Sequence, residues 1–218
     1  MDSLDFSFHG QQFRARASGA LSWPRQQALL VADLHLGKSE RMARRGGALL
    51  PPFETAATLA RLEAEITDTG ARHLICLGDS FDDDQAAIGL QDALAGLCAD
   101  LSVTWILGNH DPRPKALPGL HAKEQQIAGL SLRHVARQGP DISGHYHPKL
   151  RVAGQRHPAF LIGTDHLILP AFGTYTGGLD WPCAPLSALV PEGRAILTGR
   201  RAVMVPLPLP ARRKSRFG

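Results

Sequence analysis

The chain has 218 residues, of which 44% are hydrophobic, 20% charged and 6% aromatic. This composition is typical of a folded globular protein, and the low aromatic content argues against a base-stacking platform as the main function. The three cysteines are far apart, and their odd number argues against both a disulfide framework and a thiolate zinc site and favours a reducing compartment.

The charge is unevenly distributed along the chain. The net charge is +4, but residues 194–218 hold seven basic residues and no acidic one, so the remainder is slightly acidic. We expect a single domain over residues 1–210, followed by a basic C-terminal tail over 211–218. That tail is either a solvated terminus or a contact to nucleic-acid phosphates.

Membrane and secretory segments are not expected. No apolar run approaches the roughly 18 residues that a membrane-spanning helix needs. The N-terminus carries Asp2 and Asp5 and no apolar segment of the kind found in secretory signals. The sequence therefore predicts a cytoplasmic protein with no membrane partner.

The first half of the chain alternates between strand and helix patterns. In chain order, the predicted elements are short strands over 4–31 with a buried strand at 28–32, a helix at 52–69, a strand at 74–77, a helix at 83–99 and a strand at 103–107. Such alternation predicts parallel strands joined by right-handed crossovers.

The second half reads as mostly β. Strands are predicted at 130–135, 141–143, 159–162, 167–171 and 202–205, with little helix between them. An α/β half followed by a β-rich half predicts the α/β fold class, with two sheets packed face to face and helices outside.

Polar residues gather wherever a predicted strand of the first half ends. The motifs are Asp33-Leu34-His35, Gly78-Asp79-Ser80-Phe81-Asp82 and Gly108-Asn109-His110-Asp111, followed later by His134 and Gly144-His145-Tyr146-His147. Because ligands bind beyond the carboxyl ends of strands in open α/β sheets, we expect the first three motifs to converge at one edge. Carboxylate, imidazole and carboxamide donors together suit Mn, Fe or Zn, whereas the number of histidines argues against Mg.

These motifs, in this order, resemble those of the calcineurin-like metallophosphoesterases over roughly residues 29–148. A closer resemblance, to the DNA-ligase-associated metallophosphoesterases of bacterial DNA-repair gene clusters, rests on Trp23-Pro24, 30–38 (LVADLHLGK) and 170–178 (PAFGTYTGG). Members of that group are regarded as manganese-dependent DNA endonucleases. One departure is that Asp82 is not followed by the Arg-Gly often seen in phosphoprotein phosphatases, which weakens the reading as a phosphoprotein phosphatase.

The resemblance implies a fold and a set of residue roles. The fold is a four-layer α-β-β-α sandwich of two packed mixed sheets flanked by helices. The site would hold two divalent ions, Mn²⁺ in the first place, with Fe or Zn as alternatives. Asp33, His35, Asp79 and His147 would bind one ion, and Asp79, as a bridge, would bind the second with Asn109, His134 and His145. His110 would be the catalytic acid, oriented by Asp111.

These roles are chemically consistent, because two ions about 3.5–4 Å apart lower the pKa of a bridging water and neutralise phosphate oxygens. A histidine tuned by a carboxylate can protonate the leaving alkoxide. We therefore expect a binuclear phosphodiesterase that cleaves single-stranded or flexible DNA during repair. DNA is then the expected partner, and the resemblance implies an associated DNA ligase and helicase. Two alternatives stay open, a phosphoesterase of nucleotides or other small phosphoesters and a non-catalytic interaction module.

Basic residues directly after the first motif are the candidate substrate contacts. Lys38, Arg41 and Arg44 fall in the segment 37–50, which is either a substrate-binding loop or a solvated helix face. Asp82 is either a partner of the metal ligands or, as we prefer from sequence, the N-cap of the helix that begins at residue 83.

Overall fold

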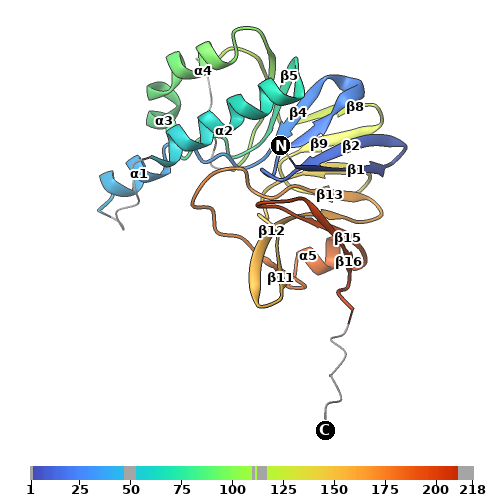
Figure 1. Cartoon of the computed structure of the whole chain (residues 1–218). Coiled ribbons are helices and arrows are strands. Elements are labelled where there is room, and N and C mark those ends of the chain that lie inside the picture. Colours follow the sequence, from blue (N-terminus) through green and yellow to red (C-terminus); the bar gives the residue numbers. More distant parts are fainter. Residues whose placement is uncertain (1, 47–52, 110, 112–116, 211–218) are drawn as a thin grey trace.

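The computed structural model describes residues 2–46, 53–109, 111 and 117–210 (Figure 1). Two features singled out from the sequence, His110 and the basic tail 211–218, lie outside these residues.

The first sheet contains seven strands in the same order in space as in sequence. They are β1 (Ser3–Phe8), β2 (Gln11–Arg16), β3 (Leu21–Trp23), β4 (Ala28–Val31), β5 (His73–Leu77), β6 (Ser102–Ile106) and β7 (Leu120–Ala122). The pairs from β1 to β4 are antiparallel, and those from β4 to β7 are parallel. A short 3₁₀ helix, η1 (Pro24–Gln26), connects β3 to β4. The carboxyl ends of β4, β5 and β6 therefore lie side by side, as the alternating pattern predicts.

The helices of the first half lie on one side of this sheet (Figure 1). They are α1 (Lys38–Arg44), α2 (Glu54–Thr69), α3 (Asp84–Gly89) and α4 (Gln91–Leu97). The predicted helix over 52–69 corresponds to α2, which ends at Gly70 in the left-handed conformation that glycine favours. The segment 37–50 contains a helix, α1, over its first residues, while residues 47–50 lie outside the described part.

The single helix predicted over 83–99 is wrong, because the structure has two helices that meet at Leu90. Leu90 leaves helical geometry, with φ −106° and ψ 5°, directly after Gly89. Glycine is a poor helix former, so a break next to it is inexpensive. The helix start also differs from the expectation for Asp82, since it is the Asp83 side chain that accepts the N–H of Ala86, at 2.9 Å.

The second sheet contains nine strands and is built from the second half of the chain. They are β8 (Glu124–Ile127), β9 (Leu130–Arg133), β10 (Asp141–Ser143), β11 (Lys149–Val152), β12 (Gln155–Ile162), β13 (His166–Ile168), β14 (Asp180–Trp181), β15 (Gly193–Leu197) and β16 (Val203–Leu207). The sheet is mixed, because β10 runs parallel to β9 and β13 while β12 pairs antiparallel with β11, β13 and β15. Within the described residues, the second half adds only one short helix, α5 (Leu186–Leu189).

Three buried hydrophobic clusters pack the layers against one another. The first fills the space between the sheets and includes Phe13, Leu30 and Phe160. The second packs the first sheet against the helices and includes Leu62 of α2 and Leu94 of α4. The third covers the outer face of the second sheet and includes Leu161, Leu186 and Val190. The predicted α/β fold of two packed mixed sheets flanked by helices is therefore confirmed, although among the described residues α5 is the only helix on one flank (Figure 1).

None of the helices in the described residues is long and apolar enough to span a bilayer.

Candidate metal centre

The candidate ligands follow the ends of strands from both sheets. Asp33 comes after β4, Asp79 after β5 and Asn109 after β6. From the second sheet, His134 follows β9, while His145 and His147 follow β10. Because the two sheets pack face to face, both sets meet at one edge of the sandwich.

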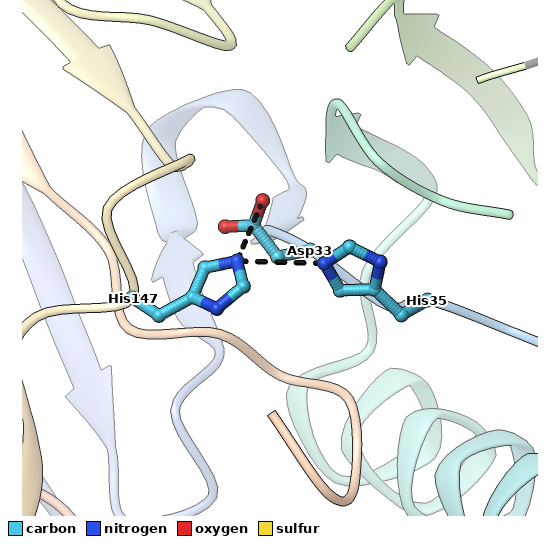
Figure 2. Close-up of side chains that lie close together, drawn as sticks. All are labelled: Asp33, His35 and His147. Atoms are coloured by element: carbon cyan, nitrogen blue, oxygen red, sulfur yellow. Dashed lines mark hydrogen bonds and ion pairs between the residues drawn. The ribbon is translucent and has the colours of Figure 1, made fainter. Parts of the chain in front are cut away.

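Cluster one consists of Asp33, His35 and His147, which offer ligand atoms within 4.8 Å of one another. The Nε2 atom of His147 lies 3.3 Å from Oδ1 of Asp33 and 3.5 Å from Nε2 of His35 (Figure 2). Oδ1 of Asp33 is buried and accepts no hydrogen bond within the described residues. A buried carboxylate oxygen without a donor, facing imidazole nitrogens, is suited to a cation.

Cluster two consists of Asp79, His134 and His145, again with ligand atoms within 4.8 Å of one another. Nε2 of His134 lies 3.4 Å from Oδ2 of Asp79 and 3.1 Å from Nδ1 of His145. It also lies 3.1 Å from Oδ1 of Asn109, so the carboxamide belongs to the same group. The structure thus brings all seven sequence-predicted ligands to one edge.

The hydrogen bonding of His134 shows why cluster two fits a metal ion. Nδ1 of His134 lies 3.0 Å from the carbonyl oxygen of Leu77, which can only accept, so Nδ1 carries the proton. In the neutral ring Nε2 then presents a lone pair toward Asn109 Oδ1 and Asp79 Oδ2, which are acceptors as well. Acceptors that face one another this closely need a positive charge between them.

The pKa values of these histidines follow from the same geometry. Burial disfavours the imidazolium of His134, but the carboxylates of Asp79 and Asp33 outweigh it and raise the pKa of His134. Burial, helped by the charge of His134, lowers the pKa of His145. The ring of His134 thus marks the place where the carboxylates attract a positive charge.

The two clusters touch each other through Asp33. Its Oδ2 accepts the backbone N–H of His145 at 2.9 Å, and its Oδ1 lies 3.8 Å from Nδ1 of His134. Asp79 lies in cluster two, and its role as a bridge to cluster one stays a prediction. Contact between the clusters is what a two-ion site requires, since its ions lie about 3.5–4 Å apart.

Asp82 contacts a metal ligand rather than capping a helix. Its Oδ1 lies 3.3 Å from Nδ1 of His35, and its Oδ2 forms an ion pair with Arg41 of α1. Burial alone would raise the pKa of Asp82, but the bonds from His35 and Arg41 hold it below its usual value. A carboxylate on the far nitrogen of a ligand histidine fixes the ring and increases its basicity. The cap interpretation drawn from sequence is therefore wrong.

The backbone at the site is held in an uncommon conformation. Five candidate ligands have positive φ angles, namely Asp33 (54°), His35 (46°), Asp79 (48°), His145 (72°) and His147 (46°). Outside glycine this region costs on the order of 1–3 kcal/mol per residue, and it persists where the surroundings enforce it. Such a concentration of left-handed residues at one edge is typical of a functional site.

Two glycines allow the side chains to approach this closely. A Cβ atom on Gly108 would lie 2.1 Å from Oδ1 of Asp79. A Cβ atom on Gly78 would lie 2.2 Å from Nδ1 of His134, and Gly78 also has φ +83°. Both distances are far below van der Waals contact, so each position requires glycine.

Asp111 binds the backbone of the turns that carry the ligands. Its carboxylate accepts the N–H groups of Ser80 at 2.6 Å, Phe81 at 3.1 Å and Gly108 at 2.8 Å. It therefore ties the turn after β5 to the turn after β6, a role that sequence reasoning did not anticipate. The expected partner of Asp111, His110, lies outside the described residues.

The candidate substrate contacts on α1 all have partners within the protein. Lys38 donates from Nζ to the carbonyl oxygen of Tyr175 at 3.2 Å. Arg41 is paired with Asp82, and Arg44 with Asp83. The basic segment is therefore a helix whose charges bind neighbouring acids and a carbonyl, and a role in binding substrate stays a prediction.

Comparison with known proteins places this geometry in a family. The family model described as Calcineurin-like phosphoesterase matches residues 27–158, a range that contains all seven candidate ligands. The structure is similar to the crystal structure of the nuclease MPE of Pseudomonas putida, with a TM-score of 0.74 and 29% sequence identity, over 94% of this chain and 100% of that chain. No curated protein matches the chain significantly. Since the family match spans more than half of the sequence, this chain belongs to the calcineurin-like phosphoesterase family, whose members use divalent metals to hydrolyse phosphoester bonds.

Proposed function

We propose that the protein is a manganese-dependent nuclease that holds two metal ions and hydrolyses phosphodiester bonds of DNA. The observation that carries the proposal is the pair of touching clusters, Asp33, His35 and His147 beside Asp79, His134 and His145. The similarity to a nuclease over the whole of that chain supports nucleic acid as the substrate class. The mixture of imidazole and carboxylate donors favours Mn over Mg.

Divalent ions bound at the two clusters supply Lewis acidity to the phosphate oxygens and lower the pKa of a water molecule. The protein itself fixes the donors. The carbonyl of Leu77 holds His134 in the tautomer that directs Nε2 into the site, and Asp82 does the same for His35. Because five candidate ligands are held by uncommon backbone geometry, the donors are positioned before substrate arrives.

We propose His110 as the acid that protonates the leaving oxygen, with Asp111 as its orienting partner. A carboxylate offers about four acceptor positions, and backbone N–H groups use three of those of Asp111. One position is left for an imidazole N–H. The resemblance to metallophosphoesterases of DNA-repair gene clusters further motivates a role in repair together with a DNA ligase and a helicase, and co-purification from cells can test that association.

The function is tested by supplying metal-free protein with Mn²⁺, Fe²⁺, Zn²⁺ or Mg²⁺ and following cleavage of single-stranded and double-stranded oligonucleotides. We expect nicking with Mn²⁺, strongest on single-stranded or flexible DNA. The Asp79→Ala variant, purified identically, controls for contaminating nucleases and should lose the activity. If the loaded protein hydrolyses bis-p-nitrophenyl phosphate or nucleotides but leaves every DNA intact, the small-substrate alternative replaces this proposal.

A further inference from the structure

A cavity of about 440 Å³ opens directly beside cluster two, and two of the candidate ligands, Asn109 and His134, form part of its wall. Its volume falls within the range of roughly 300–1,000 Å³ that is usual for ligand sites. The cavity is therefore large enough to hold a part of the substrate that adjoins the reacting phosphate.

Around this cavity the acidic side chains have hydrogen-bond partners, whereas two of the basic side chains have none within the described residues. Its carboxylates are both engaged, since Glu124 accepts from Nη2 of Arg133 at 2.9 Å and Asp111 accepts three backbone N–H groups. Two of its cations, Lys123 and Arg137, are exposed, and their side chains have no hydrogen bond or ion pair within the part of the chain that the structure describes. The cavity thus presents free positive charge next to the metal centre.

Arg133 gives this cavity a fixed cationic wall. The residue is buried, with 8% of its surface exposed, and is held between Glu124 and Asp141, 3.9 Å away. Its Nε atom is buried and has no hydrogen-bond partner within the described residues. Unlike Lys123 and Arg137, each basic residue of α1 that was predicted to bind substrate already has an internal partner.

We propose that this cavity binds the backbone phosphate next to the scissile one, through Lys123 and Arg137, beside the fixed charge of Arg133. The inference rests on the proposed nuclease function and deepens it. In a nucleic-acid strand the next phosphate is one sugar away from the reacting one, so it must lie beside the ions. A small diester has no such second phosphate. The cavity therefore favours polymeric substrates over small phosphoesters.

The test compares two substrates in one variant, Lys123→Ala with Arg137→Ala. Both side chains are exposed and unpartnered within the described residues, so the variant should fold. We expect kcat/KM on a single-stranded oligonucleotide, divided by that on bis-p-nitrophenyl phosphate, to fall about tenfold or more. The salt dependence of oligonucleotide binding should also weaken by about 0.7 in log–log slope for each lost phosphate contact.

Two further variants sharpen the test. Lys123→Arg keeps the charge and should retain the wild-type substrate ratio. Arg25→Ala removes an exposed charge from η1, at the end of β4 opposite the ligands, and should change neither ratio nor slope. A double variant with the wild-type ratio and slope, in a protein that cleaves DNA, overturns the inference and leaves the proposed function intact. A wild type that neither binds nor cleaves DNA overturns the proposed function, and the inference falls with it.

Discussion

The two clusters are built from similar donors but have different surroundings. In cluster one, His35 faces the carboxylate of Asp82, which is itself paired with Arg41 of α1. In cluster two, His134 faces the neutral carbonyl of Leu77, and its other side borders the 440 Å³ cavity. His35 thus belongs to a network of charged side chains, whereas His134 lies between a backbone carbonyl and the cavity.

We infer from this difference that cluster one mainly holds its ion, whereas cluster two also faces the substrate. A charged partner increases the basicity of a ligand histidine, so the network of Asp82 and Arg41 should strengthen metal binding in cluster one. A carbonyl fixes the tautomer of His134 without adding charge, and a cavity adjoins this histidine on its other side. We therefore expect changes near cluster one to alter the metal requirement and changes near cluster two to alter catalysis more directly.

The most severe test of this division removes a ligand from cluster two. Asp79→Asn should lower kcat about 10³-fold or more, because the ion that neutralises the developing charge is lost. Metal analysis should show one fewer Mn²⁺ per chain. Asp92→Asn on the exposed side of α4 is the matched control and should keep both metal and activity. Full activity with two ions bound in Asp79→Asn would contradict the role of cluster two.

A backbone change tests the same cluster without touching a ligand. Gly108→Ala should lower kcat about 100-fold, because the new Cβ would displace the Asp79 carboxylate from 2.1 Å away. The comparison is Gly96→Ala within α4, where a Cβ meets nothing within 4 Å. That change should leave activity as it is and raise the free energy of unfolding by about 0.5–1 kcal/mol, measured by thermal melts. Equal activities for the two alanine variants would contradict the claim that a Cβ atom at position 108 displaces the Asp79 carboxylate.

A smaller and different effect is expected beside cluster one. Asp82→Asn should weaken Mn²⁺ binding by about 10–100-fold, and activity should return when Mn²⁺ is raised. Titration of metal-free protein with Mn²⁺ measures this shift. Asp83→Asn is the control, since asparagine caps a helix as well as aspartate does, and its Mn²⁺ curve should match the wild type. If Asp82→Asn lost activity at every Mn²⁺ concentration, the contact to His35 would serve more than metal binding.

The smallest effect concerns the outermost member of that network. Arg41→Ala should raise the Mn²⁺ requirement only up to about fivefold, because Arg41 acts on His35 only through Asp82, which keeps its own contact to the ring. The shift should be the same whether DNA or bis-p-nitrophenyl phosphate is the substrate. A higher KM for DNA at an unchanged Mn²⁺ requirement would instead support the substrate-binding role that the sequence suggests for Arg41.

The strands of the parallel part of the first sheet, and the residues that follow them, could be predicted because their sequences carry clear local patterns. β4 is apolar on both faces, so its position was clear, and Asp33 had to lie where that run stops. The same holds for Asp79 and Asn109 after the next two strands. The strand ends were therefore enough to predict the ligands that the first sheet contributes, whereas the choice of His134, His145 and His147 came from the resemblance to the metallophosphoesterases.

Tertiary contacts decided what local patterns could not. Asp82 and Asp83 are equally good caps by sequence, and only the approach of His35, 47 positions earlier in the chain, assigns Asp82 to the metal centre. Lys123 and Arg137 belong to no motif, and it is the pairing of β8 with β9 that places their segments beside His134. The basic cluster on α1 was conspicuous in sequence, yet Arg41 and Arg44 are paired with nearby acids and Lys38 donates to a backbone carbonyl.

The division of the ligands between two sheets has a consequence for how the enzyme comes into being. The first sheet contributes Asp33, His35, Asp79 and Asn109, while the second contributes His134, His145 and His147. During translation, no complete ion-binding cluster exists until the later histidines have left the ribosome and their sheet has docked. A partly synthesised chain therefore lacks part of each cluster, and the candidate metal centre forms only when both sheets have folded and packed together.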